Sequence, residues 1–564
     1  SSGTAMIDMN DDNLLDFVVA NRGEEFDPEF ASPDRYYLQN SDGTFTQHEI
    51  DIYNDSEGVT ISDHNRDGNI EFLFYGGINH FVYYEHNEFW GGDGDMYESY
   101  VMGGYFTLNS SSYDFDLDGD LDYINVGSNN YNGATFLFNQ IQNLDDDDME
   151  TDFFWWFEQF MNFGEVNTLN GFELNGDEIG VGYSVSCLDI NNDDKGDIFL
   201  ANLDHNNQLF FNITQNEEDN DIEFLSIDNL QITTQDDGTI GASWADYDND
   251  GDMDVVIVRH LDNMSSLYNN AEGLFLPVFE FPSSMGSSWG DLNNDGLIDL
   301  VTTNQTDYDS YLHINLGDNS FESKILPSGD HRGVSIGDMD NDGDLDIYIA
   351  NRSGQNNTVL INEGNDNNWI NIRCIDNIGN RLSIGTKVKV KASINSIPTW
   401  QYQEIMSQTG AGFGGLNSLN VEFGLGNATL IDSMIVHWSL GQKDTMTNID
   451  VNQFLTLYNE EQSLAVDNIS IPSEFRLNNN YPNPFNPITN ISYDIPMAID
   501  VKIEIFNIMG QSVKILANTF HQPGVHKIQW DASNDAGQPV SAGMYIFTIR
   551  AGEFRQTRKM VLLK

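Results

Sequence analysis

The stretch "GDMDNDGDLDIYIANRSG", residues 337–354, sets acidic side chains close together and then turns into an apolar run. Four of its acidic residues, Asp338, Asp340, Asp342 and Asp346, stand at the positions that matter here. Carboxylates at alternate positions of a tight loop point toward one centre, where their repulsion is costly unless a cation lies between them. Gly343 stands at the sixth position, where a sharp turn favours a positive φ. The stretch therefore predicts a loop that binds a hard divalent cation.

The loop is similar to the calcium loop of an EF-hand but ends differently. An EF-hand loop closes with a glutamate at the twelfth position and continues into a helix. Here the ninth residue, Asp346, closes the loop, and "IYIA" continues as a strand rich in β-branched and aromatic residues. Because the proposed ligands are all oxygens, without Cys or His, we expect calcium.

The same spacing, D-x-[DN]-x-D-x-x-x-[DE] before an apolar run, occurs seven times, so we expect up to seven calcium ions. The proposed ligands are Asp8, Asn10, Asp12 and Asp16 in the first loop, Asp63, Asn65, Asp67 and Glu71 in the second, Asp114, Asp116, Asp118 and Asp122 in the third, Asp189, Asn191, Asp193 and Asp197 in the fourth, Asp246, Asp248, Asp250 and Asp254 in the fifth, Asp291, Asn293, Asp295 and Asp299 in the sixth, and Asp338, Asp340, Asp342 and Asp346 in the seventh. Successive loops begin 45 to 75 residues apart, a period that suits a four-stranded propeller blade.

Each repeat has the pattern of a β-meander: a short strand such as "GVSIGD", the acidic loop, and two more strands such as "DIYIAN" and "TVLINEG". This pattern resembles the FG-GAP/VCBS repeats of integrin-α-like proteins. The resemblance implies a seven-bladed β-propeller over residues 1–365, with calcium in loops on one rim. Two loops depart from the pattern, because Asn13 replaces the sixth-position glycine of the first and the glycine of the fourth moves to Gly196. We expect these two sites to be looser.

A second β-rich module is predicted over residues 366–461. Its segments "NWINIRCI", "NRLSIGTKVKV" and "SMIVHWSLGQKD" resemble the ASPIC/UnbV domain. Gly410, Gly412 and Gly415 match the dinucleotide fingerprint G-x-G-x-x-G, but no βαβ unit surrounds them, so a nucleotide site is rejected. We expect a tight surface loop whose backbone is available for contact.

Residues 469–564 form a third predicted domain, an Ig-like β-sandwich, because alternating segments such as "VKIEIFNI" and "MYIFTIR" are separated by turns. The segment resembles the type A C-terminal sorting domain of the type IX secretion system. The residues that match are Pro482, Asn483, Pro484, Phe485, Asn486, Pro487, Gly543, Tyr545 and the basic residues Arg555, Arg558, Lys559 and Lys564. The resemblance implies recognition by the type IX machinery and a protein secreted from, or attached to the outer surface of, a Gram-negative bacterium.

The charge of the chain is strongly negative, with 90 Asp and Glu against 23 Lys and Arg and a net charge of −67. This balance argues against nucleic acid as a partner.

No apolar stretch approaches the ~20 residues that span a bilayer, so no transmembrane segment is expected. Cys187 and Cys374 are expected to be buried free thiols. Ser1 is not an initiator methionine, which suggests a mature or truncated chain.

Residues 145–163, "DDDDMETDFFWWFEQFMNF", carry aromatic side chains at helical spacing between the third and fourth loops. They indicate either a lid or carbohydrate-stacking platform, or a helix that packs on a blade, and we favour the packed helix. Trp244 and Trp289 precede their loops at equivalent positions, which indicates packing.

The sequence contains no G-x-S-x-G elbow, no H-E-x-x-H motif and no compact Cys/His cluster. His64 and His437 are interpreted as structural. We therefore expect an all-β, calcium-stabilised surface binding or adhesion protein without catalytic activity, whose ligand is an extracellular protein or glycan. Two alternatives stay open: a subunit of an extracellular polymer, which would associate with itself, and a propeller-based polysaccharide lyase or hydrolase.

Overall fold

The computed structural model of the chain forms two compact units, Ser1–Glu461 and Gln462–Lys564. It describes residues 3–562 except Asp11, Asn13, 22–32, 41–42, 51–55, 64–69, 77–78, 86–94, 103–106, Asp116, Asp118, Asp120, 128–132, 138–181, 215–222, 235–237, 261–262, Glu272, Ser353, 378–379, 413–414, 460–474, 478–482, Pro484, Asn486, Ile488, 497–498, Ile508, 522–523, Asp531, 535–537, Pro539 and Glu553. The predicted segment 145–163 thus lies outside the described residues, as does His64.

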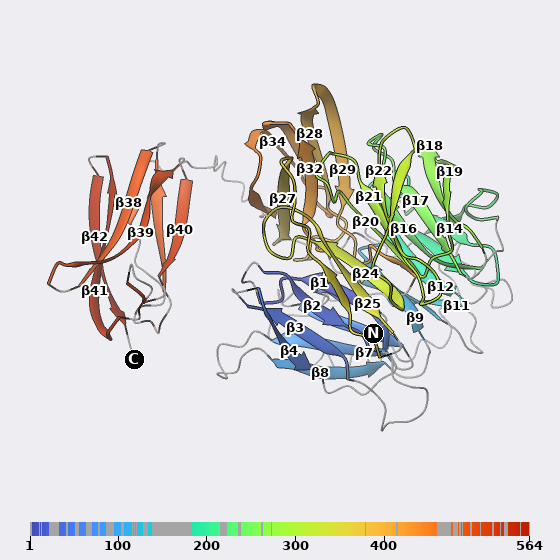
Figure 1. The fold of residues 1–564 in the computed structure, drawn as a ribbon, viewed down its shortest axis with the longest axis horizontal. Helices are drawn as coiled ribbons and strands as arrows, with labels where there is room; N and C mark the ends of the chain where they lie inside the picture. The colour runs from blue at the N-terminus through green and yellow to red at the C-terminus, as the bar shows by residue number, and fades with distance from the viewer. Residues whose placement is uncertain are drawn as a thin grey trace. The chain divides into compact units, whose positions relative to one another are not determined.

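Seven antiparallel sheets follow one another along the described part of the first unit (Figure 1). Their strands, sheet by sheet, are β1 (Thr4–Ile7), β2 (Asp16–Val19), β3 (Arg35–Gln39) and β4 (Phe45–Glu49); β5 (Ser56–Ser62), β6 (Ile70–Gly76), β7 (Asn79–Glu85) and β8 (Asp95–Met102); β9 (Thr107–Tyr113), β10 (Asp122–Gly127) and β11 (Gly133–Leu137); β12 (Gly182–Leu188), β13 (Asp197–Asn202), β14 (Gln208–Asn212) and β15 (Phe224–Ser226); β16 (Thr239–Ala245), β17 (Asp254–Arg259), β18 (Ser265–Ala271) and β19 (Leu274–Phe281); β20 (Gly286–Gly290), β21 (Asp299–Thr303), β22 (Tyr311–Asn315) and β23 (Phe321–Ile325); and β24 (His331–Gly337), β25 (Asp346–Asn351) and β26 (Thr358–Leu360). The described residues contain no helix, so the predicted all-β class is confirmed.

The first strand of each sheet lies at the inside of the array. Each first strand contacts that of the next sheet, and the last, β24, contacts β1, so these contacts run around a ring. The inner strands carry many small residues, as in "TLNSSSY" and "TIGASWA", which lets them approach one another closely. This order is the one expected for a β-propeller, and the number of blades stays a prediction.

Side-chain amides at or just beyond the ends of third strands bind several sheets to the loop of the preceding one. Nδ2 of Asn315 donates to the Tyr247 carbonyl oxygen at 2.9 Å, and Nδ2 of Asn362 donates to the Leu292 carbonyl oxygen at 2.8 Å. The Gln39 side chain donates in the same way to the Met339 carbonyl oxygen at 2.7 Å, which joins the first sheet to the seventh. The ring is therefore held by a repeated side chain–backbone bond.

The β-rich module of the first unit consists of two sheets with strand orders β32-β27-β35 and β29-β28-β33-β34. Its strands are β27 (Asn368–Asp376), β28 (Lys387–Ile394), β29 (Ile397–Glu404), β32 (Val421–Gly426), β33 (Leu430–His437), β34 (Lys443–Asp450) and β35 (Phe454–Asn459). Alternate residues of β28, Val388, Val390 and Ala392, are buried in its core, as the period of two requires.

Residues 405–412 and 415–420 of this module, here called the central segment, lie among the inner strands of the ring. Two short strands, β30 (Ala411–Gly412) and β31 (Gly415–Leu416), pair with β20 and β1. The Ser407 hydroxyl donates to the Ser112 carbonyl oxygen on β9 at 2.8 Å, and Oδ1 of Asn417 accepts from the Ile336 backbone N–H on β24 at 2.9 Å. The central segment thus contacts inner strands of several sheets, including β1, β9, β20 and β24.

The prediction that Gly410, Gly412 and Gly415 form a surface loop is wrong. Their neighbours Ala411 and Leu416 are buried, and a Cβ on Gly412 or Gly415 would overlap a carbonyl oxygen of an inner strand. The glycines are present because backbone approaches backbone there. The composition of the segment is that of a surface loop, and its burial depends on strands that lie far away in the sequence.

The second unit contains two sheets around one apolar core, with strand orders β36-β37-β40 and β39-β38-β41-β42. The strands are β36 (Arg476–Leu477), β37 (Thr489–Ile495), β38 (Ile499–Asn507), β39 (Ser512–His521), β40 (Gly524–Trp530), β41 (Gly543–Ala551) and β42 (Phe554–Leu562). Phe485 is buried and its backbone N–H donates to the Val561 carbonyl oxygen at 3.0 Å, which ties the proline-rich motif to the last strand. The Ig-like assignment stays a prediction.

The cysteine and tryptophan predictions are confirmed. Cys187 and Cys374 are buried free thiols, and burial raises the pKa of both to about 12. Trp244 and Trp289 are buried, and the Trp244 ring packs between Phe199 and Phe275.

We expect Gly412→Ala to destabilise the first unit by about 1–3 kcal/mol more than Gly273→Ala, measured by chemical denaturation. Both glycines have a positive φ, 77° and 86°, so both substitutions introduce backbone strain. Only at Gly412 would the added methyl group overlap a neighbour, because the space around Gly273 is open. Equal losses in the two variants would contradict the close packing of the central segment.

Candidate metal sites in the acidic loops

The acidic loops join the first strand of each sheet to the second and are numbered here 1 to 7 in chain order, with positions 1 to 9 from the first aspartate. Loop 5, for example, joins β16 to β17 and contains Asp246 at position 1 and Asp254 at position 9. Because the connection is the same in every sheet, the loops lie at equivalent ends of their sheets.

The position-9 carboxylate anchors the loop through two backbone amides. In loop 6, Asp299 accepts hydrogen bonds from the N–H of Leu292, at position 2, at 3.0 Å and from the N–H of Asn315, at the end of the third strand, at 2.7 Å. Equivalent pairs of bonds occur at Asp16, Asp197, Asp254 and Asp346. One buried side chain thus fixes the loop and two strands of its sheet.

The position-1 carboxylate shapes the turn inside the loop. In loop 7, Asp338 accepts from the N–H of Asp342 at 3.1 Å and from the N–H of Gly343 at 2.9 Å. Gly343 has a φ of 90°, as the sequence predicts for position 6. The arrangement recurs at Asp246 and Asp291, so the predicted turn chemistry is present in loops 5, 6 and 7.

Position 4 is a structural residue that the sequence analysis missed. Asn249 and Asn294 have φ values of 61° and 54°, and each donates its side-chain amide to the carbonyl oxygen at position 6 of the next loop, Gly296 at 2.8 Å and Gly343 at 3.0 Å. Asn tolerates the left-handed conformation better than most residues. The recurring "N-D" before the glycine in "DNDG" and "NNDG" is the signal that could have found it.

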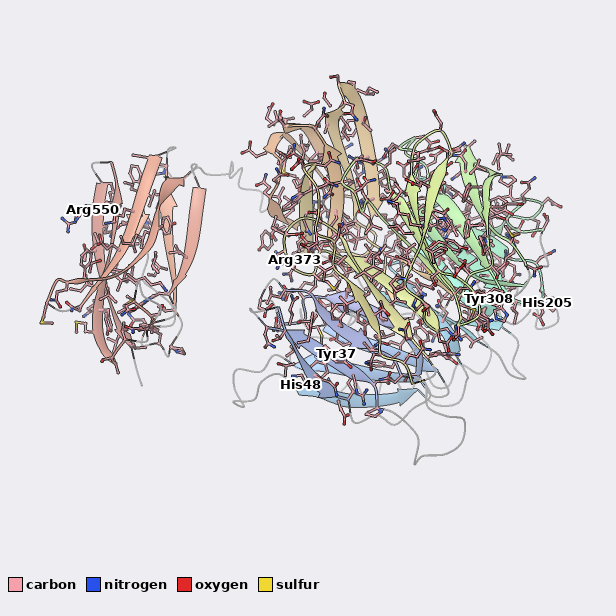
Figure 2. The ribbon with its side chains drawn as sticks, viewed as in Figure 1. Tyr37, His48, His205, Tyr308, Arg373 and Arg550 are labelled. Carbon is pink, nitrogen blue, oxygen red and sulfur yellow. The ribbon has the colours of Figure 1, made fainter. Side chains whose placement is uncertain are left out.

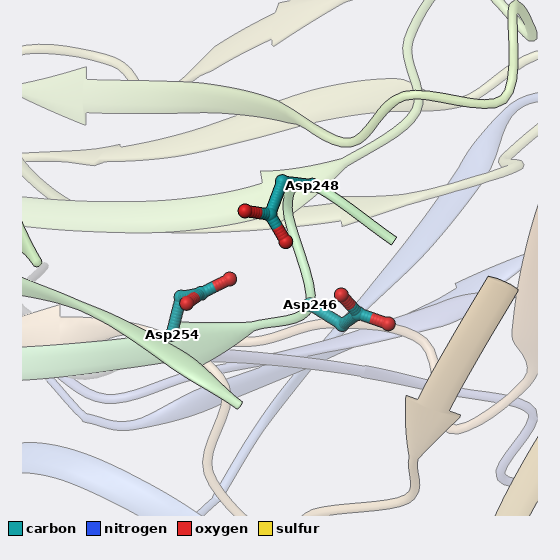
Figure 3. A group of neighbouring side chains, drawn as sticks. All are labelled: Asp246, Asp248 and Asp254. Carbon is teal, nitrogen blue, oxygen red and sulfur yellow. The ribbon is translucent and has the colours of Figure 1, made fainter. Parts of the chain in front are cut away.

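Loops 5 and 7 bring three carboxylates together. One oxygen from each of Asp246, Asp248 and Asp254 lies within 4.8 Å of the others (Figure 3), and the same holds for Asp338, Asp340 and Asp346. In loops 1, 4 and 6, position 3 is an asparagine, which offers a neutral oxygen instead. Oxygen donors converging from a tight loop fit a hard cation such as calcium.

Burial makes these carboxylates costly to ionise without a cation. It raises the pKa of Asp246 to about 7 and, with the repulsion of its neighbours, that of Asp254 to about 9. In loop 7, burial raises the pKa of Asp338 to about 7. A divalent cation would offset this penalty, which is the electrostatic argument for metal at these loops.

In loops 1 and 4 the position-1 carboxylates contact basic side chains of the β-rich module. Arg373, labelled in Figure 2, donates to Asp8 at 2.8 Å, and Lys387 donates to Asp189. Burial opposes the charge of Lys387, but Glu404 and Asp189 raise its pKa, so it stays an ammonium. These two contacts were not predicted, because the residues that form them are separated by 365 and 198 positions.

Loops 2 and 3 are described in part. Asp63, Glu71, Asp114 and Asp122 are buried, and Asp122 accepts from the Phe115 N–H at 3.1 Å as position 9 does elsewhere. The predicted ligands Asn65, Asp67, Asp116 and Asp118 lie outside the described residues.

Three family models match the chain. The FG-GAP-like repeat matches residues 8–74, 189–257 and 291–349, which contain all of the acidic loops except loop 3. The ASPIC and UnbV model matches residues 377–464, and the secretion system C-terminal sorting domain matches residues 479–563. The three resemblances seen in the sequence are thus confirmed.

A search of curated proteins finds no match. Among solved structures, the chain is similar to PorZ of Porphyromonas gingivalis, described as an essential bacterial surface component of the type IX secretion system, with 11% identity, a TM-score of 0.29, and a match covering 100% of this chain and 70% of that one. A dimeric latent PorU of the same organism matches at 9% identity and a TM-score of 0.14, covering 61% and 36%. At these TM-scores neither structure supports an inference.

The C-terminal sorting domain marks this chain for type IX secretion, so the protein is secreted or attached to the surface of a Gram-negative bacterium. Within the described residues, no helix has the length and apolar character needed to cross a membrane.

We expect Asp299→Ala to lower the free energy of unfolding by about 2–6 kcal/mol in chelator, because two buried N–H groups lose their acceptor at about 1–3 kcal/mol each. Chemical denaturation with excess chelator excludes any contribution from metal. Asp307→Ala, at an exposed position in the turn between β21 and β22, is the control. A loss no larger than that of the control would show that position 9 does not anchor the loop.

Proposed function

We propose that this type IX secreted chain, with its FG-GAP-like repeats and its ASPIC and UnbV domain, is a calcium-stabilised binding protein without catalytic activity. In this proposal the propeller occupies residues 1–365, the β-rich module 366–461 and the sorting domain 469–564. The observation that carries the proposal is the clustering of three carboxylates, two of them buried, in each of loops 5 and 7. Its ligand is an extracellular protein or glycan.

The calcium assignment is supported by ligand chemistry and burial. Asp254 and Asp346 are fully buried at position 9, and every proposed ligand is an oxygen donor. Extracellular calcium modules bind with dissociation constants on the order of 10⁻⁴–10⁻³ M. Binding to the folded state alone then raises stability by mass action.

The non-catalytic assignment is supported by the way the acidic residues are used. Paired carboxylates can serve a glycosidase as acid and nucleophile, but such groups must be free to exchange protons or attack substrate. In loops 5 and 7, both oxygens of position 9 accept backbone N–H groups, at Asp254 from Tyr247 and Asn270. These carboxylates therefore fit an anchoring and metal-binding role.

Removal of calcium is expected to lower the Tm of the first unit, since several loops would lose their stabilising cation. Differential scanning calorimetry in millimolar calcium and then in excess chelator measures the change, and magnesium is the control cation because it prefers a rigid octahedral site. An unchanged Tm, together with no calcium by elemental analysis after dialysis in millimolar calcium, would refute the calcium sites.

A glycan array and a polysaccharide turnover screen with the secreted protein test the binding function. We expect calcium-dependent retention of a glycan or an extracellular protein, with no release of reducing ends or unsaturated products. Turnover that survives repeated purification would instead establish the enzyme alternative, and polymer formation on size-exclusion chromatography would favour the structural subunit.

A further inference from the structure

We propose that Lys387 and Arg373 of the β-rich module take the place of calcium in loops 4 and 1, so that these loops bind the module instead of a metal ion. The proposal deepens the proposed function, because it rests on calcium binding at the remaining loops and states which loops bind calcium. It reduces the predicted seven ions to at most five.

In loop 4, the Lys387 ammonium lies where a cation is required. Its Nζ donates to Asp189, the position-1 carboxylate, and at 2.7 Å to Oδ1 of Asp194. The side chains of Lys387 and Asp189 are 7% and 0% exposed, so the pair is shielded from solvent. A calcium ion that used Asp189 would have to lie next to the ammonium, and two cations at that separation repel strongly where the effective dielectric is low.

In loop 1, the Arg373 guanidinium has the same role. Its Nη1 donates to Oδ2 of Asp8 at 2.8 Å from β27, while Oδ1 of Asp8 accepts the Asp12 N–H at 3.0 Å. The backbone N–H is a bond that the other loops also make, whereas the guanidinium adds a positive charge at the position-1 carboxylate. Charge-assisted bonds of this kind are stronger than neutral ones.

Among the described residues, the loops whose carboxylates pair with a basic side chain of the module, loops 1 and 4, are also the two that depart from the motif. Position 6 is glycine in loops 2, 3, 5, 6 and 7, but it is Asn13 in loop 1 and Asp194 in loop 4. The departure in loop 4 is directly involved, because Asp194, with a φ of 67°, supplies the second carboxylate that binds the ammonium. Loss of the motif glycine and gain of an internal cation therefore occur together.

The β-rich module presents different groups to loops 6 and 7. Gly424 approaches the Asp291 carboxylate of loop 6, and the Trp369 ring lies against Gly343 of loop 7. Among the described residues, no Lys or Arg forms an ion pair with a proposed ligand of loops 5, 6 or 7. Among the described residues, the ion pairs between the module and the loops thus form where the motif glycine is missing.

Calcium stoichiometry of the full chain tests the proposal. Elemental analysis after dialysis in millimolar calcium should give no more than five ions per wild-type chain. The variant Lys387→Met/Asp194→Gly removes the ammonium and restores the motif glycine, and it should bind one ion more than the wild type. Lys391→Met is the matched control, because Lys391 is on the same strand but its ammonium lies over the Trp400 ring.

Thermal unfolding of the same proteins separates this proposal from the proposed function. In chelator, Lys387→Met should lower the Tm by several degrees, whereas Lys391→Met should not. In millimolar calcium the Tm of Lys387→Met should recover much of this loss, because the freed loop binds an ion. The proposal would be overturned if the wild-type chain bound seven calcium ions. It would also be overturned if the folded variant Lys387→Met/Asp194→Gly bound no more calcium than the wild type. A wild-type chain that binds no calcium would refute the proposed function. In that case a lowered Tm of Lys387→Met in chelator would still show that the ion pair stabilises the protein.

Discussion

The buried aspartate at position 9 is the interaction on which the rest of the first unit depends. Asp299 accepts one N–H from its own loop and one from the end of the third strand, so a single side chain joins the loop to two strands. A buried carboxylate that lost these bonds would leave both partners unsatisfied, which explains why an aspartate or, in loop 2, a glutamate stands at position 9 of every loop. The positions of the other loop oxygens follow from this anchor, so the candidate metal sites are built on a structural hydrogen-bond network.

Neighbouring sheets are also joined by polar side chains that form hydrogen bonds with backbone groups. Asn294 reaches the next loop and Asn315 reaches the preceding one, at 3.0 Å and 2.9 Å. Each bond contributes only about 1 kcal/mol net, but nearest-neighbour terms add along a repeated array. The central segment adds contacts of another kind, because its glycines let backbone pair with β1 and β20 at the inside of the ring.

The sequence predicts what depends on local spacing. The all-β class, the order of loop and strand, and the positive φ of Gly343 follow from residues a few positions apart, and the structure confirms them. It could not predict that Gly412 is buried, since the strands that cover it are more than a hundred residues away. The basic partners of Asp8 and Asp189 were missed for the same reason, although Asn13 and Asp194 already marked those loops as different.

In a chain with a net charge of −67, a basic side chain and a calcium ion neutralise a loop under different conditions. A calcium site with millimolar affinity is filled only where calcium is abundant, whereas an ammonium on the same chain is present at any calcium concentration. Arg373 and Lys387 both belong to the module that carries the central segment, and they bind loops of the first and fourth sheets. On the proposed function, the attachment of the β-rich module to the ring through these ion pairs does not depend on calcium, whereas the stability of the calcium-binding loops does.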